Sequence, residues 1–152
     1  MSYVKPATFR AALMAAMRAW TVEPLKSAIF RVGPVQSVRL DGTEDALVIV
    51  SFTGLEGGER SAGSGNNWFH NPGFEVLLAV PDDEDDPETA DTNLLALLDE
   101  FGLCIHANRS IASCRVVHFV AAPVFIGCLF ENSTQVFRLI PVDLRYQTLR
   151  GG

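Results

Sequence analysis

The residues best suited to covalent chemistry are Cys104 and His106, which are separated by one position. A cysteine nucleophile needs its thiol within hydrogen-bonding reach of an imidazole base, and a third group must orient that base. At i and i+2 the two side chains share a face only in an extended segment, and no third partner is evident. We therefore expect a small core cysteine beside a solvated histidine, and we predict no catalytic residues.

Metal and phosphate sites are equally poorly supported by spacing. The histidines His70, His106 and His118 and the cysteines match no compact metal-ligand interval. The acidic run 82–88 lacks the glycine and glutamate register of an EF-hand loop. The glycine-rich tract 54–65 contains no Gly-Lys-Ser or Gly-Lys-Thr, and its glutamates would repel phosphate. We predict no metal and no cofactor.

The composition indicates one globular domain that does not wrap nucleic acid. The chain has 152 residues, of which 48% are hydrophobic and 20% charged, with a net charge of −6. Binding along a nucleic acid requires a basic footprint, whereas an acidic wall lets DNA pass without sticking. The three cysteines include no CxxC pair, which favours free thiols in a reducing compartment.

No segment resembles a signal peptide or a membrane span. Residues 1–6 open no apolar stretch, so we expect no signal peptide and synthesis in the cytoplasm. The longest apolar stretch, 116–130, is interrupted by His118, Pro123 and Gly127 and is too short to cross a bilayer. We expect no membrane partner.

The first half of the chain predicts a helix followed by strands. Residues 6–20 are alanine-rich and place Phe9, Leu13, Met17 and Trp20 on one stripe. The tract 21–34 contains Pro24 and Pro34 and can hold a short helical turn. Strands are predicted at 35–40, 46–53 and 74–80, with a turn at Asp41-Gly42 and a long polar arm or hairpin at 54–73.

The second half predicts a helix followed by three strands. Asp86 can cap this helix and Pro87 fits its first turn, while Gly102 is a natural stop. Its apolar stripe consists of Leu94, Leu97, Leu98 and Phe101. The sequence pattern favours neither a helix nor a strand for residues 103–113. Strands follow at 114–120, 124–130 and 134–148, the last buried on much of both faces, and a hairpin turn is predicted at 131–133.

This order of elements predicts a single α+β domain over residues 1–152. Its mixed or antiparallel β-sheet is packed by two amphipathic helices on one face. The arm 54–73 ends near Trp68 and Phe69, and adjacent aromatics in a polar loop often mark an anchor for a partner. Packing of Trp68 back onto the core is the equal alternative.

The layout resembles the tail terminator (tail completion) proteins of long-tailed bacteriophages. The resemblance rests on the opening helix with Phe9, Leu13 and Met17, the strands at 46–52 and 74–81 that flank a polar arm, the leucine-rich helix at 94–98, and the closing strands 124–131 and 134–148. The chain departs from this layout in its long tract 21–42 before the first strong strand.

The resemblance implies a structural virion protein without enzyme activity. Such proteins form a ring, usually a hexamer, at the head-proximal end of the tail. The implied partners are further copies of the chain, the tail tube protein, a head-completion or connector protein, and DNA that passes through the lumen without specific binding.

These partners define two sets of candidate residues. The candidate interface residues are Glu59, Arg60, Asn66, Asn67, Trp68, Phe69, His70, Arg138, Arg145 and Tyr146. The candidate acidic residues facing the lumen are Glu56, Asp82, Asp83, Glu84 and Asp85.

Other functions remain open at this point. One is a different head–tail or baseplate adaptor of the same virion class. Another is a small ligand-binding or Cys/His enzyme domain that uses Cys104 and His106. The end of the chain, Leu149-Arg150-Gly151-Gly152, is identical to the conjugation tail of ubiquitin, although the chain is longer than ubiquitin and begins with a predicted helix.

Overall fold

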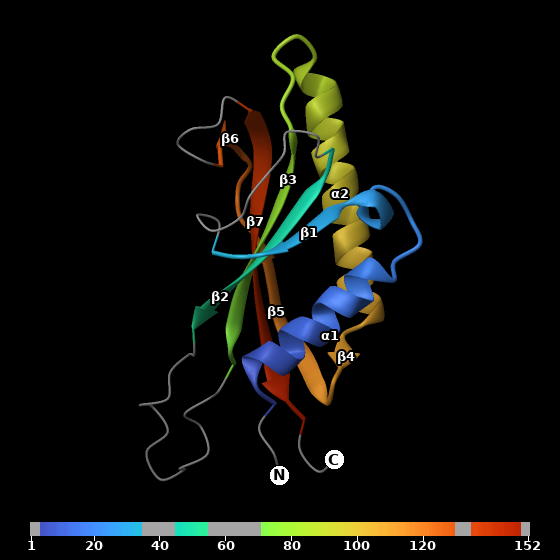
Figure 1. Ribbon diagram of the computed structural model, residues 1–152, viewed down its shortest axis with the longest axis vertical. Helices are drawn as coiled ribbons and strands as arrows, with labels where there is room; N and C mark the ends of the chain where they lie inside the picture. The colour runs from blue at the N-terminus through green and yellow to red at the C-terminus, as the bar shows by residue number, and fades with distance from the viewer. Residues whose placement is uncertain (1–3, 35–44, 55–70, 130–134, 150–152) are drawn as a thin grey trace.

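A seven-stranded mixed sheet forms the centre of the protein, and the fold is α+β, as predicted (Figure 1). The computed structural model describes residues 4–34, 45–54, 71–129 and 135–149. The strands are β1 (Ile29–Val32), β2 (Leu47–Gly54), β3 (Gly73–Pro81), β4 (Ser110–Ile111), β5 (Cys114–Ala121), β6 (Phe125–Cys128) and β7 (Val136–Thr148).

The long strand β7 organises the sheet because it has neighbours on both sides. On one side it pairs antiparallel with β3, from Gly73↔Arg145 to Pro81↔Phe137. On the other side it pairs antiparallel with β5 and then with β6. Beyond β3, β2 is antiparallel and β1 is parallel to β2, so the order is β1-β2-β3-β7-β5-β4. The sheet is therefore mixed, and β1 and β4 lie at its two ends.

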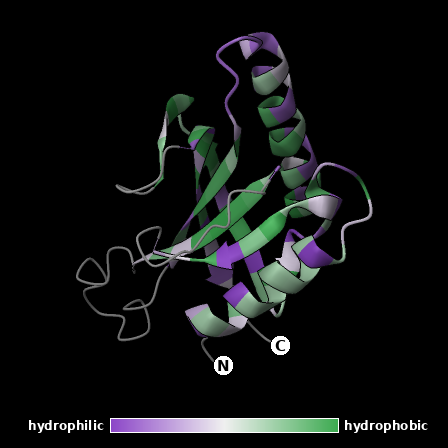
Figure 2. Cartoon of the chain, turned by 45° about the horizontal axis from the view of Figure 1, so that its top comes forward, coloured by the Kyte–Doolittle hydropathy of each residue, from purple (hydrophilic) through white to green (hydrophobic). Residues whose placement is uncertain are grey.

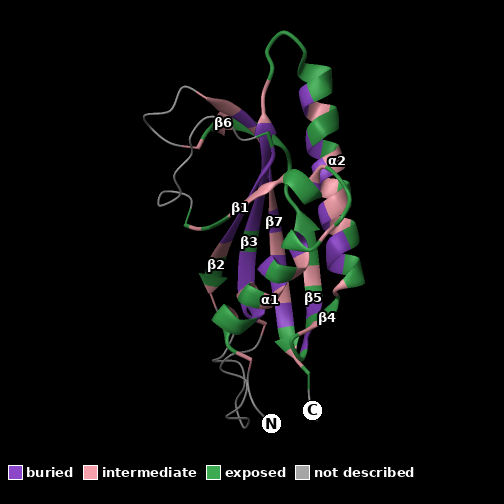
Figure 3. Ribbon diagram, turned by 45° about the vertical axis from the view of Figure 1, so that its right-hand side comes forward, coloured by how far each residue is buried: buried purple, intermediate pink, exposed green. Residues whose placement is uncertain are grey.

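Both predicted helices pack on the same face of the sheet. The helices are α1 (Pro6–Arg18) and α2 (Pro87–Ala107). The ring of Phe9 stacks on that of Tyr146 with centroids 4.1 Å apart, and the Trp20 indole donates a hydrogen bond of 3.0 Å to Glu100. The main core lies between these helices and the alternate residues of β2, β3 and β7, as the buried colouring of Figure 3 shows.

The second helix begins as predicted but ends later. Asp86 accepts hydrogen bonds from the backbone and side chain of Thr89, which lower the pKa of the Asp86 carboxyl. The prediction that Gly102 ends the helix is wrong, because α2 continues to Ala107. Cys104 and Ile105 are buried against the core. Their packing outweighs the roughly 1 kcal/mol by which glycine disfavours a helix interior.

Residues on the face away from the helices form a second, smaller core cluster. It contains buried side chains of β2, β3 and β7, with Ile29 and Leu129 packed against it: Leu47, Ile49, Leu77, Ala79, Phe137 and Leu139. Burial of β7 on both faces is confined to residues 137–140, and the strand then alternates between buried and partly exposed residues. The prediction of two-sided burial holds for only that part of β7.

Residues 21–34 contain the 3-10 helix η1 (Leu25–Ser27), in line with the expected helical turn, and strand β1. The predicted strand 35–40, the turn at Asp41-Gly42, most of the arm 54–73 and the turn 131–133 lie outside the described residues. Within the part of the chain that the structure describes, no helix is long and apolar enough to cross a membrane.

Candidate functional site: an apolar sheet edge

Strands β5 and β6 together form one bent edge that runs beside β7. The last pair of β5 is Ala121↔Val142, and the first pair of β6 is Phe125↔Leu139. Between them, the Ala122 amide donates a hydrogen bond of 2.8 Å to the Pro141 carbonyl. The chain therefore stays beside β7 through the connection, and we call residues 117–128 the edge strand.

The outer side of the edge strand has no neighbouring strand among the described residues. In the described ranges, strand β4 pairs only with Cys114 and Arg115, at the beginning of β5, and strand β6 pairs only with β7. The backbone N–H and C=O groups on the outer side of the edge strand are consequently available to another chain.

The edge strand is also apolar and exposed. Every residue from 119 to 126 is exposed, and Val120, Phe125 and Ile126 expose 51%, 48% and 52% of their surface. The same stretch is coloured largely hydrophobic in Figure 2 and largely exposed in Figure 3. Its large exposed side chains are Val117, Phe119, Val120, Val124, Phe125 and Ile126. Exposed apolar side chains concentrated along an unpaired edge typically mark a binding surface.

The edge strand adjoins α2 through an aromatic contact and a groove. The rings of Phe119 and Phe101 stack with centroids 5.7 Å apart. Beside them lies a groove of about 240 Å³ between the end of α2 and β5. Its lining residues are Gly102, Ile105, His106, Arg109, Val116, Val117, His118 and Phe119. Apolar side chains therefore share the lining of this groove with two histidines and an arginine.

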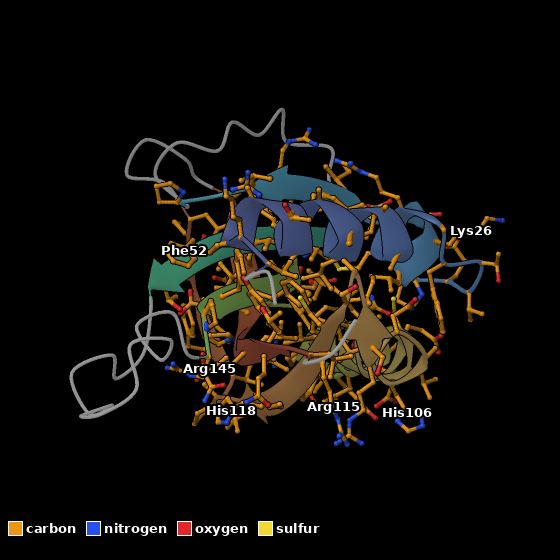
Figure 4. The ribbon with its side chains drawn as sticks, turned by 90° about the horizontal axis from the view of Figure 1, so that it is seen from below. Lys26, Phe52, His106, Arg115, His118 and Arg145 are labelled. Atoms are coloured by element: carbon orange, nitrogen blue, oxygen red, sulfur yellow. The ribbon has the colours of Figure 1, made fainter. Side chains whose placement is uncertain are left out.

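Charged and polar side chains lie near the beginning of the edge strand. The imidazole of His118 lies 3.1 Å from the Asp143 carboxylate, and Arg145 lies 3.4 Å from the same carboxylate. Seen from below, Arg145, His118, Arg115 and His106 lie along one rim of the molecule (Figure 4). This rim gathers basic side chains around the Asp143 carboxylate, in a chain that is acidic as a whole.

The predicted interface residues of β7 occupy different environments. Arg145 is partly exposed beside Asp143. The side chain of Arg138 exposes 14% and bonds to Asp82 at 2.6 Å and to Asp91 at 3.4 Å. Tyr146 is fully buried, and its hydroxyl donates a hydrogen bond of 2.7 Å to the Val4 carbonyl. The placement of Tyr146 at an interface is therefore corrected, because its side chain belongs to the core.

The remaining interface candidates and Glu56 lie outside the described residues: Glu59, Arg60, Asn66, Asn67, Trp68, Phe69 and His70.

The acidic run divides between structural and exposed residues. Asp82 is nearly buried and pairs with Arg138. Asp83 accepts hydrogen bonds from the backbone amides of Asp85 and Asp86, at 3.0 and 3.2 Å, and thus shapes the turn before α2. Asp83, Glu84 and Asp85 are all exposed, whereas Asp82 is not. Only the exposed carboxylates retain the solvent contact that a channel lining requires.

Cys104 and His106 do not form a nucleophile–base pair. Both lie in α2, where positions i and i+2 point in different directions. Burial raises the pKa of the Cys104 thiol, whereas His106 is exposed. No group of three or more His, Cys, Asp or Glu side chains that could hold a metal occurs within residues 4–34, 45–54, 71–129 and 135–149.

The candidate interface residues predicted from the sequence include none of the edge strand. A usable signal existed, since no lysine, arginine, aspartate or glutamate occurs between Arg115 and Glu131, and Pro123 interrupts the stretch. Proline within a strand pattern favours an edge position.

A scan against protein-family models and a search of curated proteins found no match for this chain.

Proposed function

We propose that this chain is a structural virion protein that forms a ring, caps the tail tube of a long-tailed bacteriophage and joins it to the head. The observation that carries the proposal is the edge strand, with its exposed apolar side chains and its free outer side within the described part of the chain. An edge of this kind invites pairing with another chain, which natural sequences prevent unless the pairing has a use.

The architecture supports this function in a second respect. The ends of the sheet carry different surfaces, β1 with η1 at one end and the edge strand with β4 at the other. A protein with two different contact surfaces can associate head to tail, and such contacts produce a closed ring when the rotation between copies closes.

The acidic composition of the chain suits a ring whose channel lets DNA pass. Exposed carboxylates, including Glu84 and Asp85, would repel the phosphates of DNA that passes through a lumen. In this function the protein binds copies of itself, the tail tube and a head-completion or connector protein, and it carries out no reaction.

The test is to image the purified chain and to add it to a growing tube. We expect native mass spectrometry and negative-stain electron microscopy to show rings. We also expect the chain to stop polymerisation of the tail tube protein encoded near it. A chain that stays monomeric at every concentration and leaves tube growth unchanged would contradict the proposal.

Gene order distinguishes a terminator from another head–tail or baseplate adaptor. The gene of a terminator is expected between head-completion genes and the gene of the major tail tube protein. A position among baseplate genes would favour the adaptor instead.

A further inference from the structure

The edge strand lacks the charged residues that commonly protect a free edge against association. Natural proteins place charged residues on free edges, or keep those edges short. Here the stretch between Arg115 and Glu131 contains His118 as its only titratable group apart from Cys128. Pro123 interrupts the edge, yet exposed apolar residues continue on both sides of it. Such an edge requires a cover in the working state of the protein.

The surroundings of the edge strand favour an acidic cover. The exposed side chains of His106, Arg109 and Arg115 lie at the end of α2, in the turn that follows it, and at the beginning of β5. His106 and Arg109 also line the groove of about 240 Å³ beside β5. A partner that presents carboxylates next to apolar groups would complement this surface.

A surface of that chemistry lies at the other end of the sheet. A groove of about 580 Å³ lies between η1, the beginning of β2 and α2, and we call it the acidic groove. It is lined by Glu23, Pro24, Ser27, Ile29, Asp45, Ala46, Val80, Asn93 and Ala96. Lys26 in η1 and Arg31 in β1 are not among its lining residues.

Apolar side chains accompany the carboxylates of the acidic groove. Ile29, Ala46 and Val80 line it, and Val22, which precedes the lining residue Glu23, exposes 46% of its surface. Glu23 is held by hydrogen bonds from the backbone and hydroxyl of Ser27, so one carboxylate of the groove is oriented by the chain itself. The groove therefore offers negative charge that complements the cations beside the edge strand and apolar groups that can cover its exposed side chains.

We infer that the edge strand of one copy, with Arg109 and Arg115, docks on the acidic groove and on the neighbouring strand β1 of a second copy. This inference rests on the proposed function, because it names the two surfaces through which the ring closes. The contact joins two different surfaces, so each copy keeps one surface for each of its neighbours.

Two variants test this arrangement by blocking one surface each. The edge variant carries Val120→Glu and Ile126→Glu, and the groove variant carries Val22→Glu and Asn93→Glu. All four positions are exposed, so the fold is expected to tolerate the changes. A matched control carries Phe52→Glu and Thr53→Glu at exposed positions of β2, which adds the same charge elsewhere. Circular dichroism checks that each variant folds.

The two blocked variants should complement each other. In native mass spectrometry we expect the wild type and the control to form rings, and each blocked variant alone to stay monomeric. An equimolar mixture of the blocked variants should form a heterodimer and nothing larger, because the pair retains only one intact edge and one intact groove that can meet.

The alternatives give distinct results. If the wild type forms rings and either blocked variant also does, the inference is wrong while the proposed function stands. If the groove variant dimerises through its intact edge, the edges pair with each other and the inference is also wrong. A wild type that never associates contradicts the inference and the proposed function together.

Discussion

Strand β3 and the edge strand are both rich in large apolar residues, but they have opposite environments. In β3, Phe74, Val76 and Leu78 are fully buried between two neighbouring strands and under the helices. In the edge strand, Val120 and Phe125 are about half exposed, at 51% and 48%. Composition alone does not separate these segments. Their positions in the sheet decide which of them stabilises the monomer and which is available to a partner.

The largest expected difference between the two segments is in folding stability. Phe74→Ala should lower the free energy of unfolding by about 3–5 kcal/mol, because it leaves a cavity in the core. The matched change Phe125→Ala should alter the unfolding of the monomer by about 0.5 kcal/mol or less. Urea denaturation at low protein concentration measures both. Equal losses would show that the edge strand is buried within the monomer.

Arg138 tests the end of β7 that lies between β3 and β6. Arg138→Ala should destabilise the protein by about 3 kcal/mol, because it leaves the nearly buried Asp82 without its cation. Asp91→Ala is the control, since Asp91 is 45% exposed and its loss should change stability by about 1 kcal/mol or less. A loss for Arg138→Ala no larger than for the control would mean that the pair is not desolvated.

A smaller effect is expected where β7 meets the N-terminal segment. Tyr146→Phe removes the hydrogen bond to the Val4 carbonyl but retains the stacking on Phe9. The free energy of unfolding should fall by about 1 kcal/mol, as for a typical buried hydrogen bond. Unchanged stability would indicate that the Val4 carbonyl finds an equally good hydrogen-bond donor, such as water, in the variant.

The cysteines compare the exposed edge with the core without altering the fold. Cys128 lies exposed in β6, whereas Cys104 and Cys114 are buried. Burial raises the pKa of Cys114 to about 11, so its reactive thiolate is scarce at pH 8. A thiol reagent at pH 8 should modify Cys128 rapidly and the buried pair only after denaturation. Rapid modification of all three thiols in the folded protein would contradict the assigned burial.

Local patterns were sufficient to predict most of the fold. The predicted strands 46–53 and 74–80 correspond to β2 and β3, and Asp86 caps α2 as expected. The late end of α2 was missed because glycine at position 102 is tolerated when the following residues are buried. The parallel pairing of β1 with β2 and the central place of β7 depend on contacts between distant segments, which periodicity does not encode.

The candidate site was less predictable from the sequence. A run such as Phe119 to Ile126 has the hydropathy of a buried strand, and only its place at the end of the sheet leaves it exposed. Tyr146 was predicted at an interface, but the alternation of side chains along β7 directs it into the core. The lack of charge between Arg115 and Glu131 was the available signal.

Hydrogen exchange tests the cover of the edge strand most directly. Amide exchange of the wild type, followed by mass spectrometry at low and high protein concentration, compares peptides from residues 117–128 with peptides from β3. We expect the edge-strand amides to become protected as concentration rises, while those of β3 are protected throughout. Association without added protection in residues 117–128 would contradict the account.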